Sequence, residues 1–226
     1  MAKRKKTKKQ DETLVDIVEV KQTTQDFFEK NQNIVLGVLA AIIILVGGLV
    51  FYNTMIKGPR EKNAMAAMFR AEEQFARDSF ALALENPGGG FDGFLDIIDN
   101  YRGTKTANLA NYYSGVSYLN LGRYDAAIEY LTDFKPAGKI TPIMKNGALG
   151  DAFSELGDFE KALSFYKKAT QPKNEFLTPY YLKKVGLLSE KLGDKSGALK
   201  AYTEIKENFF DSNEATDIEK YIARVS

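Results

Sequence analysis

The chain has 226 residues and a net charge of +1, and it contains no Cys, His or Trp. Without Cys and His it can form no disulfide, no Ser-His-Asp triad and no His-ligated zinc site. Residues 58–226 carry 22 Lys and Arg against 24 Asp and Glu, and such a near-neutral body lacks the electrostatic footprint of a nucleic-acid binder. We therefore expect a non-enzymatic protein with no cofactor, no metal, no nucleic acid and no small-molecule substrate.

The first predicted segment is a basic arm at residues 1–33. Six of its eight Lys and Arg lie in the first nine residues, within the run "KRKKTKK". Such a run is typical of a solvated tail, and it also suits contact with anionic lipid or RNA. The stretch "LVDIVEVKQTTQDFF" at 14–28 fits either a helix lying on a membrane surface or disorder.

A transmembrane anchor is predicted at residues 34–56. Ile34–Tyr52 is an uninterrupted apolar run of 19 residues, long enough as a helix to cross a hydrocarbon core of about 30 Å. A cleaved signal peptide is disfavoured because 33 residues precede the run and no small-x-small site follows it. The alternative is a buried core helix.

The distribution of positive charge bears on the orientation of this anchor. The Lys-rich arm favours a cytoplasmic amino terminus, although Lys57, Arg60, Lys62 and Arg70 follow the anchor closely. Because long domains translocate largely regardless of charge, the arm has the greater weight. The expected location is the bacterial inner membrane, with one span and a periplasmic body; the reversed topology is the alternative.

Small residues lie towards one side of the predicted anchor helix and are candidates for docking to another transmembrane helix: Gly37, Ala40, Ala41, Gly47 and Gly48. Small residues let helix backbones approach closely in lipid. Gly and Ala are also simply common in such helices, so both interpretations stay open.

A helical lead-in is predicted at 57–107. Pro59 suits the start of a helix, and a helix over about 59–85 would have Met65, Met68, Phe69 and Phe75 as its apolar positions. The loop "NPGGGFDG" at 86–93 contains G-x-G-x-x-G, but no strand is expected beside it, so a dinucleotide site is not predicted. With "FLDIIDNY" as a second helix, 59–103 is a possible degenerate helical pair.

Three repeats are predicted at 108–212. The segments 114–131, 149–166 and 185–202 align without gaps, and each carries a mid-helix glycine, a second glycine seven residues later and an alanine five residues after that. The alanines Ala127, Ala162 and Ala198 are 35 and 36 residues apart. A period in the mid-thirties with two helices per unit is typical of a solenoid.

Each repeated position has a packing explanation. The first glycine lets the partner helix approach, and the second ends a helix in a left-handed conformation. Asp158 and Asp194 follow it and are expected to cap the next helix. The alanine then lies at the helix crossing, and the aromatic residue four positions on (Tyr166, Tyr202) fills the next gap on the same face.

This pattern resembles the tetratricopeptide repeat, which implies an all-α fold: a single N-terminal transmembrane helix followed by a helix-turn-helix solenoid. Some positions depart from it. Ser189 replaces the aromatic residue of the first two repeats, and Phe134 and Ile205 replace the small residue that Ala169 supplies in the second repeat. Ala215, Ile218, Ile222 and Val225 form one stripe, which predicts a capping helix at 213–226.

By resemblance, the first helices of the repeats line a groove for an extended or helical protein segment. The implied groove residues are Leu109, Tyr112, Val116 and Asn120 in repeat one, Met144, Gly147, Asp151 and Glu155 in repeat two, and Tyr180, Lys183, Leu187, Glu190 and Lys191 in repeat three. Variants that bind chaperone C-terminal carboxylates have Lys and Asn where this chain has Tyr112 and Val116, which argues against that mode.

The whole arrangement, with "AMFRAEEQFARDSFALAL" at 67–84 and the join at 93–131, resembles the YfgM-type membrane-anchored proteins, in the version found in Bacteroidota. The resemblance implies an ancillary subunit of the SecYEG translocon that works with a PpiD-type periplasmic chaperone on emerging secretory proteins. The alternative is a scaffold of another envelope machine, for cell-wall synthesis or outer-membrane assembly. An enzyme that uses carboxylates alone has no support in the sequence.

Overall fold

The structure is a computed structural model that describes residues 29–171 and 173–226. Every regular element in this part of the chain is helical, and none of it is strand. The chain divides into two compact units, Met1–Gly58 and Pro59–Ser226. Residues 1–28 of the predicted basic arm, which include the stretch 14–28, lie outside the described residues.

The first unit contains the apolar helix α2, Gln32–Phe51, followed by a π-helical turn, η1, at Tyr52–Lys57. The hydroxyl of Thr54 donates to the carbonyl of Val50 at 2.8 Å, which satisfies a polar side chain within the helix itself. No residue of α2 is buried. Within the described residues, one helix is long and apolar enough to cross a membrane, and its apolar window lies here near the N-terminus. By length and composition it fits either a membrane span or a signal sequence.

The second unit opens with three helices, α3 (Gly58–Ala76), α4 (Phe80–Glu85) and α5 (Phe94–Asn100). Pro59 lies in the first turn of α3, where its missing N–H has no helical partner to lose. The prediction of one helix over 59–85 was wrong, because the chain turns between α3 and α4. Asp78 has a positive φ of 56° at this turn, a conformation in which Asp is one of the better-tolerated residues.

The packing of α3 also differs from the predicted stripe. Its buried residues are Ala64, Met68 and Ala71, so Met65 and Phe69 lie on the outer side and are exposed. Because two of its three buried side chains are small, α3 packs closely against its neighbours along a narrow apolar stripe. Phe75 joins this core through ring contacts, with its centroid 5.4 Å from Phe80 and 4.8 Å from Tyr113.

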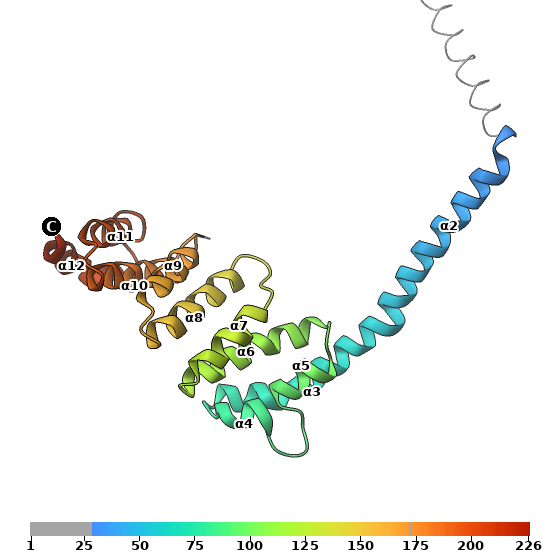
Figure 1. The fold of residues 1–226 in the computed structure, drawn as a ribbon, viewed down its shortest axis with the longest axis horizontal. Helices are drawn as coiled ribbons and strands as arrows, with labels where there is room; N and C mark the ends of the chain where they lie inside the picture. Colours follow the sequence, from blue (N-terminus) through green and yellow to red (C-terminus); the bar gives the residue numbers. More distant parts are fainter. Residues whose placement is uncertain (1–28, 172) are drawn as a thin grey trace, which may run out of the picture. The chain divides into compact units, whose positions relative to one another are not determined.

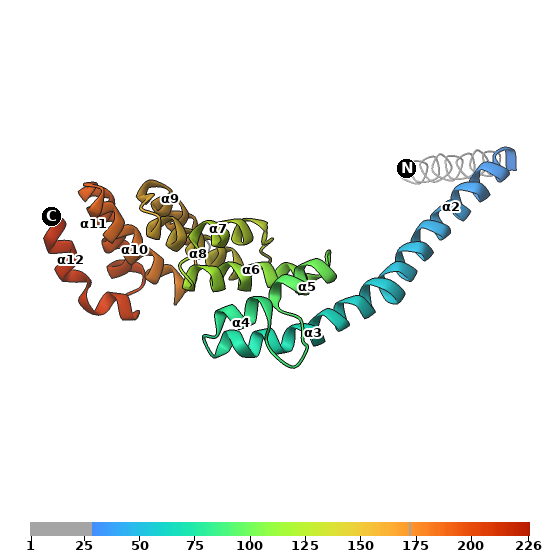
Figure 2. The same ribbon diagram turned by 60° about the horizontal axis from the view of Figure 1, so that its bottom comes forward.

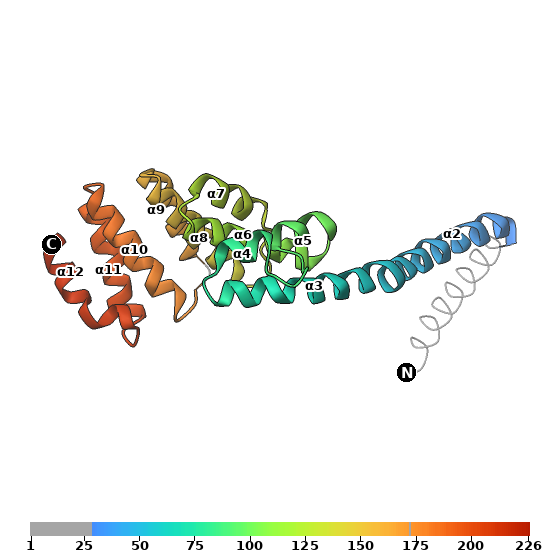
Figure 3. The same cartoon turned by 90° about the horizontal axis from the view of Figure 1, so that it is seen from below.

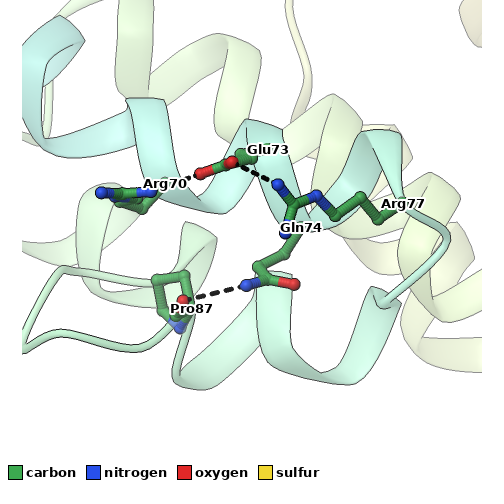
Figure 4. Close-up of polar contacts among 5 residues, drawn as sticks. All are labelled: Arg70, Glu73, Gln74, Arg77 and Pro87. Carbon is green, nitrogen blue, oxygen red and sulfur yellow. Dashed lines mark hydrogen bonds and ion pairs between the residues drawn. The ribbon is translucent and has the colours of Figure 1, made fainter.

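The loop between α4 and α5 is held against α3 (Figure 4). The side-chain amide of Gln74 donates to the carbonyl of Pro87 in the loop at 3.2 Å. On α3 and the turn after it, Glu73 accepts from Arg70 and Arg77 at 2.6 Å each. A helix precedes this Gly-rich loop and a helix follows it. The strand that a dinucleotide fingerprint requires is therefore missing from this part of the described chain, as expected.

A carboxylate joins the lead-in to the first helix of the array, α6 (Lys105–Asn120). Glu61 of α3 accepts from the backbone N–H groups of Lys105 and Thr106 at 2.7 and 2.9 Å, and from the Thr106 hydroxyl at 2.7 Å. Burial alone raises the pKa of Glu61, but these hydrogen bonds outweigh it and leave the pKa lowered. The free N–H groups at the start of α6 are thus satisfied by a side chain 44 residues earlier.

Three helical pairs follow in chain order (Figures 1 and 2). They are α6 with α7 (Tyr124–Asp133), α8 (Thr141–Glu155) with α9 (Phe159–Ala169), and α10 (Leu177–Lys191) with α11 (Lys195–Asn208). Within each pair the two helices pack against each other, and α7 packs on α8 as α9 packs on α10. Each pair therefore buries its apolar face on the next, which is how a solenoid builds a continuous core.

The repeated glycines and alanines have the predicted roles. A Cβ on Gly115, Gly150 or Gly186 would lie 2.5, 2.5 or 2.1 Å from a side chain of the second helix of its pair. Gly122, Gly157 and Gly193 all have positive φ, and Ala127, Ala162 and Ala198 are completely buried. Asp158 and Asp194 cap α9 and α11 by accepting from backbone N–H groups three residues on.

The chain ends in a 3-10 turn, η2 (Asn213–Asp217), and α12 (Ile218–Val225), which packs on α11 (Figure 3). Ile218 and Val225 are buried in a core that includes Tyr202 and Ile205 of α11. Ala215 and Ile222 are half-buried against the same core. The predicted apolar stripe thus covers the last helical pair.

Candidate functional site

Six side chains from α6, α8, α9 and α10 form a polar and aromatic group around one carboxylate, which we call the Asp151 cluster: Tyr112, Asp151, Tyr166, Tyr180, Tyr181 and Lys184. The Tyr166 hydroxyl donates to Asp151 Oδ1 at 2.7 Å, and Lys184 Nζ donates to the same oxygen. The Lys184 ammonium also lies 5.0 Å from the ring centre of Tyr180, and Tyr180 packs edge-on against Tyr181 at 5.0 Å.

A glycine makes room for this arrangement. A Cβ on Gly147 of α8 would lie 1.9 Å from the Tyr181 hydroxyl oxygen, so any larger residue would displace the ring. Tyr181 also stacks with Tyr166 at a centroid distance of 6.2 Å. The cluster is therefore a packed feature joining successive repeats.

The surroundings of Tyr112, Tyr166 and Tyr181 in the cluster raise the pKa of each of these phenols. Burial, with Tyr113 and the charge of Asp151 adding to it, raises the pKa of Tyr112 to about 12. Burial and the Asp151 carboxylate likewise raise the pKa of Tyr166 and Tyr181 well above the usual range. For Lys184, burial lowers the pKa, but the hydrogen bond and charge of Asp151 outweigh it and the pKa is raised. At neutral pH the cluster therefore contains the neutral phenols of Tyr112, Tyr166 and Tyr181 and one internally balanced ion pair.

The side chains of this cluster are of the kind found in protein-binding sites. Tyrosine supplies a rigid apolar ring and a hydroxyl, a combination enriched in protein interfaces. The one cation of the cluster is already paired with Asp151. No group of three or more potential metal-ligating residues occurs among the described residues. The cluster is therefore a candidate recognition site.

The structure brings four of the predicted groove residues together in or beside the cluster, namely Tyr112, Gly147, Asp151 and Tyr180. Leu187 lies two turns along α10 from Tyr180 and is exposed, as is Tyr180 itself. These two exposed side chains are accessible to a partner.

Two predicted groove residues face the chain's own C-terminal segment. Lys183 pairs with Asp217 at 2.8 Å, and its ammonium lies 4.9 Å from the Tyr221 ring centre. Glu190 accepts from Arg224 at 2.7 Å and from the Tyr202 hydroxyl. The capping segment occupies this side of α10, so we leave Lys183 and Glu190 out of the surface proposed for a partner.

The remaining predicted residues have other contacts. Leu109 and Val116 are half-buried beside core residues, and Met144 is half-buried in α8. Asn120 donates to the carbonyl of Val116. Glu155 accepts from Tyr124 of α7 at 3.3 Å, and the Lys191 ammonium lies 3.6 Å from the ring centre of Phe159 in α9.

Three members of the cluster were not among the predicted groove residues: Tyr166, Tyr181 and Lys184. The repeat register selects Lys183, whereas Lys184 is four residues after Tyr180 and thus on its helix face. That spacing was the available signal. Tyr166 and Tyr181 are buried, and the repeat pattern marks Tyr166 as core alone.

The small residues proposed for docking within the membrane lie on α2. A Cβ added at Gly37, Gly47 or Gly48 would meet nothing within 4 Å. The docking role of these glycines and of Ala40 and Ala41 stays a prediction.

Comparison with protein families matches tetratricopeptide repeat models at residues 109–135 and 146–171. Among solved structures, the chain is similar to nearly identical TPR-like repeats of a kinesin light chain from Podospora anserina. The two share 11% identity and a TM-score of 0.55, over 73% of this chain and 85% of the other, a likeness that concerns the fold. Comparison with curated proteins returned no match.

The fold is therefore an all-α array that contains tetratricopeptide repeats. The matches cover the α6/α7 and α8/α9 pairs, and the α10/α11 pair continues the array at the same period. Such repeats indicate a protein–protein interaction scaffold, and no enzyme family is indicated. The prediction of the fold class is confirmed.

Proposed function

We propose that this chain is a membrane-tethered interaction subunit that binds a segment of a partner protein along the Asp151 cluster and the exposed face of α10. The observation that carries the proposal is the cluster itself. It places exposed Tyr180 beside a balanced Asp151–Lys184 pair, so an apolar or aromatic side chain can pack there without leaving a charge unpaired.

The chemistry of the cluster indicates the kind of segment. The cation of the cluster, Lys184, is paired with Asp151 and is therefore not free to bind a terminal carboxylate, in agreement with the argument from Tyr112 and Val116. Ring faces and phenol groups suit an extended or helical segment with apolar side chains.

The anchor supplies the second part of the proposed mechanism. An uncleaved α2 would confine the array to the membrane surface and raise its effective concentration beside a membrane-bound partner. We propose a cytoplasmic amino terminus and a periplasmic array, and the small residues of α2 as a further docking surface.

By its resemblance to the YfgM-type proteins, the proposed partners are the SecYEG translocon and a PpiD-type chaperone. A mild-detergent pull-down from native membranes tests this, with the intact chain compared with one whose residues 34–52 are replaced by poly-leucine. We expect SecYEG and the chaperone to co-purify with the intact chain. If cell-wall or outer-membrane assembly proteins co-purify in their place, the scaffold alternative is correct.

The same pull-down separates the two proposed surfaces. Loss of the partners from the poly-leucine chain alone assigns recognition to α2. Loss from a Tyr180→Ala/Leu187→Ala variant alone assigns it to the α10 face. Both residues are exposed, so helicity should be unchanged, and Leu156→Ala, an exposed leucine at the end of α8, is the matched control.

A further inference from the structure

Two phenylalanines at the turns of the last repeat are the most exposed large apolar side chains of the second unit. Phe176 precedes α10 and is 81% exposed, and Phe210 follows α11 and is 72% exposed. The two line one hollow together with Phe209. Aromatic side chains exposed to water raise the free energy of the folded chain unless another molecule covers them.

The backbone on both sides of this hollow is held in place. Asn174 Oδ1 accepts from the N–H groups of Phe176 and Leu177 at 3.0 and 2.9 Å. On the other side the carbonyl of Phe209 accepts from Ser212 N at 2.9 Å, and the Ser212 hydroxyl accepts from Ala215 N at 3.3 Å. Both rings are therefore presented by hydrogen-bonded turns, which limits the ordering entropy lost on binding.

The rim of the hollow is acidic. Glu175, Asp211 and Glu214 line it, and no Lys or Arg is among its lining residues. None of these three carboxylates has an ion pair with another described residue. In contrast, Asp217 of the same C-terminal segment pairs with both Lys183 and Lys220 at 2.8 Å.

We infer that this hollow binds a segment of another protein in which apolar side chains are flanked by Lys or Arg. The rings of Phe176 and Phe210 take the apolar side chains, and the three carboxylates take the flanking cations. This complementarity selects the sign of the flanking charge. The hollow shares no residue with the Asp151 cluster, so the inference does not depend on the function proposed above.

The size of the surface favours a short segment over a second copy of the chain. Two aromatic side chains bury about 150–250 Å² each when fully covered. A stable complex between folded proteins commonly buries about 800 Å² per partner. The hollow is therefore large enough for a few residues of a partner.

Fluorescence anisotropy with a labelled peptide tests the inference. The full chain is placed in phosphatidylcholine nanodiscs, with empty nanodiscs as the blank. The probe has a central Leu-Phe-Leu flanked by two lysines on each side, and its matched control has glutamates in place of the lysines. We expect the lysine peptide to bind at least about tenfold more tightly, and its binding to weaken as salt rises.

Variants then test which residues are responsible. Phe176→Ser/Phe210→Ser should weaken binding of the lysine peptide by about tenfold or more, whereas Phe69→Ser, at an exposed phenylalanine of α3, should leave it unchanged. Glu175→Gln/Asp211→Asn/Glu214→Gln should remove the preference for lysine. The Tyr180→Ala/Leu187→Ala variant should bind the peptide normally, which separates this inference from the proposed function.

Three results would overturn the inference. The first is equal binding of the lysine and glutamate peptides, and the second is unchanged binding to the double phenylalanine variant. The third is concentration-dependent self-association of the full chain that the double variant abolishes, since the hollow would then bind a second copy.

Discussion

At each crossing within the three helical pairs, a mid-helix glycine faces a large side chain of the second helix. In the last pair, a Cβ on Gly186 would lie 2.1 Å from Cε1 of Tyr202, a completely buried ring. A glycine inside a helix is unfavourable by about 1 kcal/mol relative to alanine. Here the close approach of α11 requires it.

We therefore expect Gly186→Ala to destabilise the array, although alanine is the better helix former. Overpacking of this kind reduces the free energy of unfolding by about 1–3 kcal/mol, which chemical denaturation followed by circular dichroism measures. In a Tyr202→Ala background the same substitution should become neutral or stabilising. A loss of the same size in both backgrounds would show that Tyr202 is not the cause.

Ser189 is a second position where a single atom is expected to change the free energy of unfolding. It is completely buried in α10, and its hydroxyl has no hydrogen-bond partner among the described residues. We expect Ser189→Ala to raise the free energy of unfolding by about 1 kcal/mol, because a buried unpaired hydroxyl carries its full desolvation penalty. Ser164→Ala, at an exposed serine of α9, is the control and should have little effect. A decrease at Ser189 would reveal a hydrogen bond that alanine removes.

Among the elements, the C-terminal segment is attached by charges as well as by its apolar stripe. Hydrogen bonds from Lys183 and then Lys220 lower the pKa of Asp217 from 3.8 to about 2. A hydrogen bond from Arg224 likewise lowers the pKa of Glu190. A carboxylate whose pKa is lowered in the folded state stabilises that state above its unfolded pKa, and this contribution disappears as the pH falls towards the folded pKa.

From these shifts we expect Asp217→Asn to lower the thermal midpoint at pH 7. The difference from the unsubstituted chain should shrink between about pH 4 and pH 2, where Asp217 itself becomes protonated. Thermal melts across this range measure it, and Asp211→Asn, at a carboxylate without an ion pair to another described residue, is the control. A difference that stays constant down to pH 2 would contradict the ion-pair explanation.

For the molecule as a whole, retention of α2 in the mature chain distinguishes an anchor from a cleaved signal sequence. We expect the chain to remain in the membrane fraction after alkaline carbonate extraction at its full mass, because about 20 apolar residues insert stably as a helix. Release from the membrane, or a mass that lacks the first 50 or so residues, would contradict the anchor.

The orientation of the anchor in the membrane can also be tested on the whole molecule. Protease added to intact spheroplasts should digest the array and leave the anchored segment protected. Protection of the array until the membrane is permeabilised would establish the reversed topology. The Lys-rich arm is the sequence feature on which the expected orientation rests.

The sequence by itself determined the features that repeat or that depend on local composition. The period of 35 and 36 residues, the glycines at the crossings and turns, and the apolar helix all follow from local rules of helix packing and hydrophobicity. The caps by Asp158 and Asp194 belong to the same class, because each involves a contact three residues along the chain.

The tertiary structure alone decided what happens between elements. The turn at Asp78, the pairing of Lys184 with Asp151 across 33 residues, and the contacts of Lys183 and Glu190 with the C-terminal segment depend on how successive helices are rotated against each other. A repeat period assigns each residue to a position within its own unit, but a rotation of one residue places Lys184 on the face where Lys183 was expected. The packing of neighbouring helices sets that rotation, because the side chains at the crossing interlock only in particular ways.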